Sequence, residues 1–153
     1  MEIRRVRSSE TGSIWRLLHD TVHRINQADY SADELVVWAP DEYDEPHWVS
    51  RFIRTRPLVA TEGRELLGFA ELSEDGRIDL FYVHHEHQGE GIGRALMQRL
   101  RAEAASSGLS KLYCEASITA RPFFERMGFE FIEQRELKRR GEQVEVLLME
   151  SKI

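Results

Sequence analysis

A glycine-rich turn between a strand pattern and a helix pattern is the clearest chemical feature of this chain. Its residues are Gln88, Gly89, Glu90, Gly91, Ile92, Gly93 and Arg94. Glycines let backbone N–H groups approach an anion closely. The start of the following helix adds unpaired N–H donors and the positive end of the helix dipole. Together these features predict a site for a pyrophosphate group.

The spacing of the glycines separates three kinds of phosphate site. A P-loop requires a Lys directly after its last glycine, and none stands there. A dinucleotide fingerprint, Gly-x-Gly-x-x-Gly/Ala, fails because its third position falls on Arg94 or Leu96. The pattern that fits is Gln/Arg-x-x-Gly-x-Gly/Ala, from Gln88 to Gly93.

Two motifs at the right separation resemble those of the GNAT N-acetyltransferase superfamily, in its bacterial small-domain form. The first runs from Tyr82 to Leu96 and looks like the acetyl-CoA motif of that family. The second, Ala120–Phe129, is similar to the family's short helix ending in Gly-Phe. The resemblance covers nearly the whole chain. It implies acetyl transfer from acetyl-CoA, as co-substrate, to an amine, with no metal.

The resemblance also implies where acetyl-CoA binds. The strand ending at Val83 should splay from the strand Lys111–Glu115, with pantetheine in the gap. An N–H near Val83 should polarise the thioester carbonyl. The cofactor-binding residues expected from the resemblance are Phe81, Tyr82, Val83, Gln88, Gly89, Glu90, Gly91, Ile92, Gly93, Arg94, Ser117, Phe123 and Phe124.

Three positions depart from the family pattern. Phe124 stands where a Tyr usually protonates the leaving thiolate, so Tyr82 or solvent takes that role in our interpretation. Ser117 stands near the usual position of an Asn that contacts pantetheine, and His85 replaces a common Pro.

Asp79 is the candidate general base for the acceptor amine. Side chains alternate along a strand, which predicts that Arg77, Asp79, Phe81 and Val83 share one face. In the family, bases often come from this strand, two to four residues before the position of Phe81. An ion pair of Asp79 with a neighbouring Arg is an equally good interpretation. The reserve candidates are Glu71 and Glu115.

Aromatic residues before the sheet are candidates for the acceptor site. Tyr30 and Trp38 are assigned to acceptor binding, although core packing explains them equally well. The sole cysteine, Cys114, lies in a strand pattern and is interpreted as a buried core residue.

The histidines are interpreted as residues that bind no metal. His84, His85 and His87 follow one another too closely to point at one ion, so they predict a solvated loop. His19 and His23 share one face of the first helix and are expected at the surface.

The sequence patterns also predict the strands and helices that position these residues. Period-2 and period-3.6 patterns predict an α/β (α+β) fold with a mixed, mostly antiparallel sheet of about seven strands and helices on both faces. We expect one domain over residues 1–153. The expected strands are 1–7, 58–61, 66–73, 77–84, 111–115, 129–137 and 144–151. The expected helices begin at Ser8 or Ser9, at about Gly91 and near Pro122, with short helices at 32–37 and 47–54. Lys138, Arg139 and Arg140 precede Gly141 in an expected hairpin turn.

Composition narrows the choice of partners. The 153 residues carry a net charge of −6, and 41% are hydrophobic. No basic face, secretory signal or membrane-length apolar run is visible, so we expect a cytoplasmic protein that binds neither nucleic acid nor membrane. The expected partner is a small-molecule amine, with a homodimer possible. The alternatives are a non-catalytic acyl-CoA-binding module and an enzyme that acetylates protein N-termini or lysines.

Overall fold

The structure is a computed structural model that describes residues 1–139 and 141–153, except for the side chain of Arg139. The hairpin turn expected at Lys138–Arg140 therefore falls partly outside the described residues. The strands are β1 (Glu2–Arg5), β2 (Leu58–Glu62), β3 (Glu65–Leu72), β4 (Ile78–Val83), β5 (Lys111–Ala116), β6 (Glu130–Arg139) and β7 (Glu142–Lys152). The α-helices are α1 (Thr11–Ile25), α2 (Ala32–Trp38), α3 (Glu45–Thr55), α4 (Ile92–Ser106) and α5 (Arg121–Arg126), with 3-10 turns at Ser8–Glu10 and Asn26–Ala28.

Short polar caps explain why two brief helices form before the sheet. The Ser31 hydroxyl accepts a hydrogen bond from the Glu34 N–H at 3.2 Å, and the Glu34 carboxylate accepts one from the Ser31 N–H at 2.9 Å. Asp44 caps α3 in the same way by accepting from the His47 N–H. Such caps satisfy N–H groups that a helix start leaves unpaired. The two short helices expected in this stretch are confirmed.

The first helix begins later than its sequence suggests. Ser8 and Ser9 lie in a 3-10 turn, and α1 starts only at Thr11. The Glu10 carboxylate accepts from the Arg7 N–H at 2.7 Å and from the Arg4 guanidinium at 2.8 Å. These bonds hold the turn that joins β1 to α1.

The seven strands form two sheets rather than one continuous sheet. One has the order β1-β2-β3-β4 and the other β5-β7-β6, and neighbouring strands within each are antiparallel. The sheets meet at a single parallel bridge between Arg77 and Tyr113. The expected mixed α/β fold is confirmed, and so is the splay between β4 and β5.

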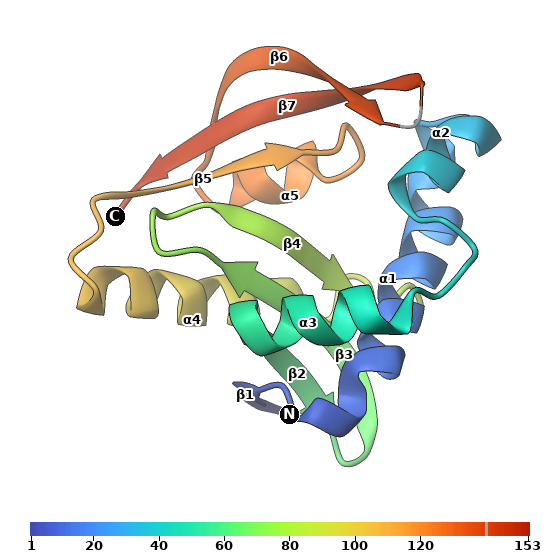
Figure 1. Cartoon of the computed structure of the whole chain (residues 1–153). Helices are drawn as coiled ribbons and strands as arrows, with labels where there is room; N and C mark the ends of the chain where they lie inside the picture. The colour runs from blue at the N-terminus through green and yellow to red at the C-terminus, as the bar shows by residue number, and fades with distance from the viewer. Residues whose placement is uncertain (140) are drawn as a thin grey trace.

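Helices cover both faces of the sheets (Figure 1). One core lies between the sheets and α4 and α5, around Leu96, Leu100 and Met149. The other lies under α1, α2 and α3, around Ile14, Leu35 and Phe69. None of the described helices is long and apolar enough to cross a lipid bilayer.

A β-bulge in β4 changes which side chains share a face. Leu72 pairs with Ile78 and Ala70 with Phe81, so the one residue of β3 between these pairs opposes two residues of β4. The extra residue breaks the alternation between Ile78 and Phe81. The expectation that Asp79 and Phe81 share one face is therefore wrong. Phe81 packs toward α4 and α5, whereas the Asp79 side chain pairs with Arg51 on α3.

Tyr30 connects the helical segment before β2 to β7 and to the loop after β5. Its hydroxyl donates to the Glu145 carbonyl at 2.8 Å and accepts from the Ile118 N–H at 2.9 Å. The side chain is buried, and burial raises its pKa to about 12. Tyr30 thus fixes the start of α2 against β7 and the loop after β5.

Replacing Tyr30 with Phe should therefore destabilise the fold. The change removes both hydrogen bonds from a carbonyl and an N–H that are partly buried, so we expect the free energy of unfolding to fall by about 1–3 kcal/mol. Urea unfolding followed by circular dichroism measures it. The control is Tyr43→Phe at a half-buried ring that packs on Trp15, with an expected change under about 0.5 kcal/mol. Equal losses of unfolding free energy in both variants would contradict a stabilising role for the Tyr30 hydroxyl.

Candidate active site

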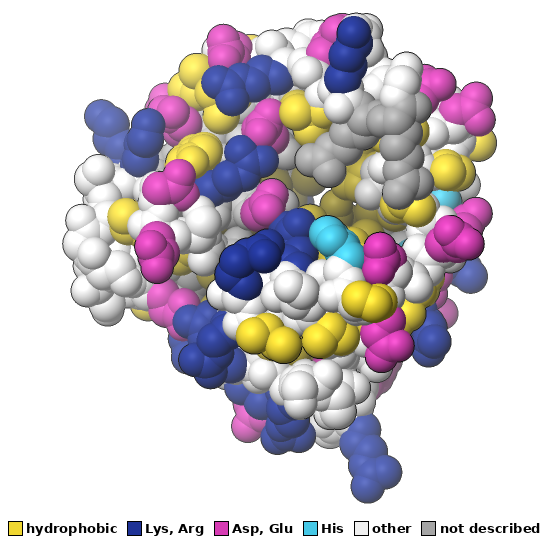
Figure 2. All heavy atoms as spheres, viewed as in Figure 1, with side chains coloured by type: hydrophobic (Ala, Val, Ile, Leu, Met, Phe, Trp, Pro, Cys, Tyr) yellow, Lys and Arg dark blue, Asp and Glu magenta, His cyan; other side chains and the backbone are white. Residues whose placement is uncertain are grey.

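A cavity of about 870 Å³ occupies the space opened by the splay of β4 from β5. Its walls come from β4, β5, the turn before α4, and the helices on both faces. In Figure 2 the hollow lies between the upper strands and α3, and charged side chains border its mouth. The predicted cofactor residues and the predicted base all belong to this region, apart from the outward-facing Glu90.

The glycine-rich turn has the geometry that an anion site requires. Gly89 and Gly91 have φ angles of +76° and +84°, and a Cβ on either would meet no atom within 4 Å. No side chain from the described residues caps the start of α4. The first N–H groups of this helix are therefore free to bind an anion.

Two residues of the motif, Gln88 and Ile92, stabilise the backbone of the glycine-rich turn. The Gln88 side chain donates to the Val83 carbonyl at 2.7 Å and holds the turn against the end of β4. Ile92 is buried in the core beside Leu96. These two positions therefore fix the backbone that the glycines leave accessible.

Gly93 serves helix packing. A Cβ there would come within 2.7 Å of the Phe123 ring, so only glycine lets α5 approach α4 this closely. The Phe123 ring lies 5.3 Å from Phe81, and Phe124 contacts both. This aromatic group forms the wall of the cavity on the α4–α5 side. Phe124 has no proton to give to a leaving thiolate.

The free edge of β4 carries backbone groups toward the gap. The His84 N–H donates to the Leu67 carbonyl at 2.8 Å, and Tyr82 pairs with Phe69 in β3. Because backbone groups alternate along a strand, those of Phe81 and Val83 point away from β3. The family resemblance predicts that an N–H near Val83 donates to the thioester carbonyl.

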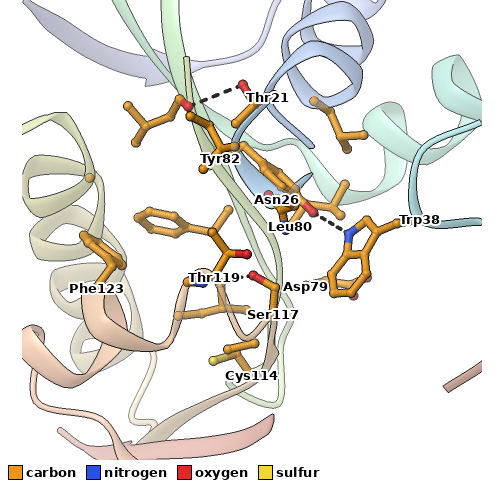
Figure 3. Close-up of a pocket in the computed structure, with 18 of the residues that line it drawn as sticks. Thr21, Asn26, Trp38, Asp79, Leu80, Tyr82, Cys114, Ser117, Thr119 and Phe123 are labelled. Carbon is orange, nitrogen blue, oxygen red and sulfur yellow. Dashed lines mark hydrogen bonds between the residues drawn. The ribbon is translucent and has the colours of Figure 1, made fainter. Parts of the chain in front are cut away.

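Tyr82 faces the opposite half of the cavity from Phe81. Its hydroxyl oxygen accepts a hydrogen bond from Trp38 Nε1 at 2.8 Å, as Figure 3 shows. Burial raises the Tyr82 pKa to about 12, so the phenol keeps its proton at neutral pH. Tyr82 can donate a proton or hydrogen bond there, but it cannot act as a base.

The three candidate bases lie in one network of ion pairs. Arg51 binds Glu71 at 2.7 Å and Asp79 at 2.6 Å. Arg77 binds Glu115 at 2.8 Å and lies 3.5 Å from the second oxygen of Asp79. Both carboxylate oxygens of Asp79 are thus paired with arginines. Each oxygen can accept a further hydrogen bond beside its arginine, so a water can deliver a proton to Asp79 while both contacts persist.

The two acceptor candidates separate in the structure. Trp38 lines the cavity, whereas Tyr30 lies in the core with its hydroxyl bound to backbone groups. Trp15 and Trp48 also line the cavity, so all three tryptophans of the chain do. No spacing signal marked Trp15 as a site residue, because it occurs in an ordinary amphipathic helix pattern.

Charge divides the cavity lining. On the α4–α5 side the lining includes Arg94 and Arg126. On the α1–α3 side the lining carboxylates are Glu42, Asp44, Asp79 and Glu115, and the two arginines there are already in ion pairs. The first side suits a polyanion such as a pyrophosphate, and the second suits a cation.

Ser117 and Cys114 line the floor between these sides (Figure 3). The Ser117 hydroxyl accepts from the Ala120 N–H at 3.0 Å and shapes the entry to α5. Burial raises the pKa of the Cys114 thiol to about 12. Because a thiol must lose its proton to attack, Cys114 is a poor nucleophile.

Replacing Gly91 with Leu should abolish binding of acetyl-CoA. A side chain at this position points into open space at the helix start, where it blocks close approach to the N–H groups. Calorimetry should show at least a roughly tenfold loss of affinity, about 1.4 kcal/mol. The control is Gly108→Leu at the other end of α4, where φ is +77° and the space is also open. Wild-type affinity in the Gly91 variant would exclude the turn as the site.

Comparisons with known proteins agree with this geometry. Residues 16–150 match the family model described as an Acetyltransferase (GNAT) domain. An uncharacterized N-acetyltransferase, YafP of Escherichia coli K12, is 33% identical over 112 residues, which covers 73% of this chain and 69% of that protein.

Solved structures show the same fold. A GCN5-related N-acetyltransferase from Rhodopseudomonas palustris superposes with a TM-score of 0.95 at 24% identity, over 99% of this chain and 95% of that one. The PaiA N-acetyltransferase from Thermoplasma acidophilum, solved with coenzyme A, has a TM-score of 0.82 at 16% identity, over 99% and 98% of the two chains.

Proposed function

Because the chain belongs to the GNAT N-acetyltransferase family, we propose that residues 1–153 form one catalytic domain that transfers an acetyl group from acetyl-CoA to a primary amine. The observation that carries this proposal is the cavity. It runs from the anion-binding turn, past the open edge of β4, to an acidic half lined by tryptophan. A donor and an acceptor therefore meet at the splay.

Acetyl-CoA binds in the α4–α5 half. Its pyrophosphate lies on the N–H groups of Gly89–Arg94, where Gly89 and Gly91 leave room. Pantetheine follows the free edge of β4, and its reactive end lies near Val83. An N–H of this edge polarises the thioester carbonyl and stabilises the oxyanion that forms on attack.

The amine attacks the thioester directly. A neutral amine held against a thioester reacts without a covalent enzyme intermediate, since positioning supplies much of the rate. The nitrogen forms a bond to the carbonyl carbon, the C–S bond breaks, and CoA leaves as a thiolate. The neutral, buried Cys114 thiol supports this route over an acetyl-cysteine intermediate.

Proton transfers use the acceptor half of the cavity. Asp79 takes the amine proton through a water, because its own oxygens are held by Arg51 and Arg77. Solvent or the Tyr82 phenol returns a proton to the thiolate, and the raised pKa of Tyr82 makes it the weaker acid for this step. Glu71 and Glu115 are reserve bases.

The acceptor is a small, cationic amine. Three tryptophans line this half, and Arg51 already lies over the Trp48 ring at 5.7 Å, so the site accommodates a cation against an aromatic face. Asp79 and Glu115 are paired with arginines, so the net negative charge of this lining comes from Glu42 and Asp44. An enclosed aromatic lining favours a small molecule over a protein N-terminus or lysine, which requires an open groove.

An amine panel with acetyl-CoA, read by release of free thiol, tests this function. The panel contrasts diamines and polyamines with neutral amines, amino acids and peptide N-termini of equal concentration. We expect turnover with the cationic amines and at least about tenfold lower kcat/KM for amino acids, whose carboxylate meets the acidic lining. Preference for peptides would favour protein acetylation. Binding of acetyl-CoA without turnover of any amine would favour a non-catalytic module.

Asp79→Asn tests the base. The change keeps the shape of the side chain and removes its basicity, so kcat/KM should fall roughly 10- to 100-fold and the acidic limb of its pH profile should disappear. Acetyl-CoA affinity should stay at the wild-type value. Asp33→Asn, on the exposed surface of α2, is the control and should leave the pH profile unchanged. Wild-type kcat/KM across pH in Asp79→Asn would move the role to Glu71 or Glu115.

A further inference from the structure

A cluster of two histidines and one aspartate lies beside the cavity but outside its lining. His19 and His23 are on α1, and Asp41 is on the connection between α2 and α3. One ligand atom from each residue lies within 4.8 Å of the others. His19 Nε2 is 2.8 Å from Asp41 Oδ1, and His23 Nε2 is 4.0 Å from the same oxygen. Within the described chain this trio converges in a way that His84, His85 and His87 do not.

Two carboxylates flank the imidazole of His19, and they favour a positive charge at the ring. Its Nδ1 lies 3.1 Å from the Asp20 carboxylate, and its Nε2 faces the Asp41 carboxylate. A neutral imidazole has one N–H and can donate to only one of these. If Nδ1–H donates to Asp20, the Nε2 lone pair points at Asp41. Either a second proton or a metal ion must then lie between Nε2 and the Asp41 oxygen.

The helix holds both imidazoles in place. His19 and His23 are four residues apart, so they project from the same face of α1 one turn apart. Their ring centres are 4.3 Å apart, and His19 also stacks on Trp15. The opposite face of α1 is buried in the core through Leu18 and Val22. A bound ion would therefore meet His19 already oriented, whereas His23 Nε2 would first give up its proton and its hydrogen bond to the Ala39 carbonyl.

We propose that His19, His23 and Asp41 form a binding site for Zn²⁺, with water in the fourth position. Two imidazole nitrogens and one carboxylate oxygen are a common zinc donor set. Tetrahedral zinc holds its ligand atoms roughly 3.3 Å apart, a value that follows from bond lengths near 2.1 Å. The distances of 2.8 Å and 4.0 Å lie on either side of it. The Asp20 carboxylate orients His19 from behind, as carboxylates do at zinc sites.

The metal would act on the acceptor half of the cavity from outside. Asp41 lies between Pro40 and Glu42, and both of these line the cavity. The same connection already contacts α1 where His23 Nε2 meets the Ala39 carbonyl at 2.7 Å. Coordination through His23 Nε2 and Asp41 would replace this hydrogen bond by two metal–ligand bonds that join the connection to α1. None of the three ligands lines the cavity, so the ion is structural and not catalytic.

Calorimetry with ZnCl₂ on the chelator-treated full chain tests the site. We expect one Zn²⁺ per chain, and a loss of at least roughly tenfold in affinity for His23→Gln and Asp41→Asn. Asp41 is exposed, so its variant should fold normally. His47→Gln removes another exposed histidine and should keep wild-type affinity. Equal affinity in all four proteins would show adventitious binding and overturn the proposal.

Amide hydrogen exchange supplies a second readout. Zn²⁺ should slow exchange in residues 39–44 of the wild-type chain and leave the rate unchanged in Asp41→Asn. Slower exchange elsewhere but not in residues 39–44 would place the ion at another site. Both measurements are independent of acetyl transfer. A negative result would overturn the zinc site and would not bear on the proposed function.

Discussion

The separation of β4 from β5 is the constraint on which the site depends. The strands meet at the Arg77–Tyr113 bridge, where the Tyr113 N–H donates to the Gly76 carbonyl at 3.0 Å. A Cβ on Gly76 would come within 2.5 Å of the Lys111 carbonyl oxygen, so this junction needs glycine. Beyond it the strands diverge, and the backbone groups of Phe81 and Val83 point into the gap, where the Gln88 side chain donates to the Val83 carbonyl. The N–H groups of this edge are donors for an extended ligand that carries acceptor groups.

Ion pairs hold the closed end of this opening. Glu71 is only 2% exposed, and burying its charge is tolerated because Arg51 neutralises it and the Thr55 hydroxyl donates to it at 2.6 Å. Arg77 then links β4 to Glu115 across the gap. The carboxylates nearest the reaction are therefore also those that hold the walls together. Because these carboxylates also hold the walls in place, the proposed mechanism transfers the amine proton through a water and not by direct contact with a carboxylate.

The sequence predicted most elements because their signals are local. Alternation, helical spacing and glycines at turns each act over a few residues, and the glycine turn before α4 followed from its spacing alone. The bulge in β4 was missed, since it depends on pairing with β3 and reversed the expected face of Asp79. The hydroxyl contacts of Tyr30 were missed for the same reason: they join residues that are 88 and 115 positions apart.

Neighbouring residues of β4 divide the chemistry between the two halves of the cavity. Phe81 belongs to the aromatic group of Phe123 and Phe124, which offers no exchangeable proton to a thiolate on that side. Tyr82, one residue later, faces the acceptor half and keeps its proton because burial raises its pKa to about 12. In the proposed mechanism, the proton that Phe124 cannot supply therefore comes from Tyr82 or from solvent, on the other side of β4. In that mechanism the acceptor half both receives the amine proton and returns one to the thiolate, so we infer that both transfers take place among Asp79, Tyr82 and Trp38.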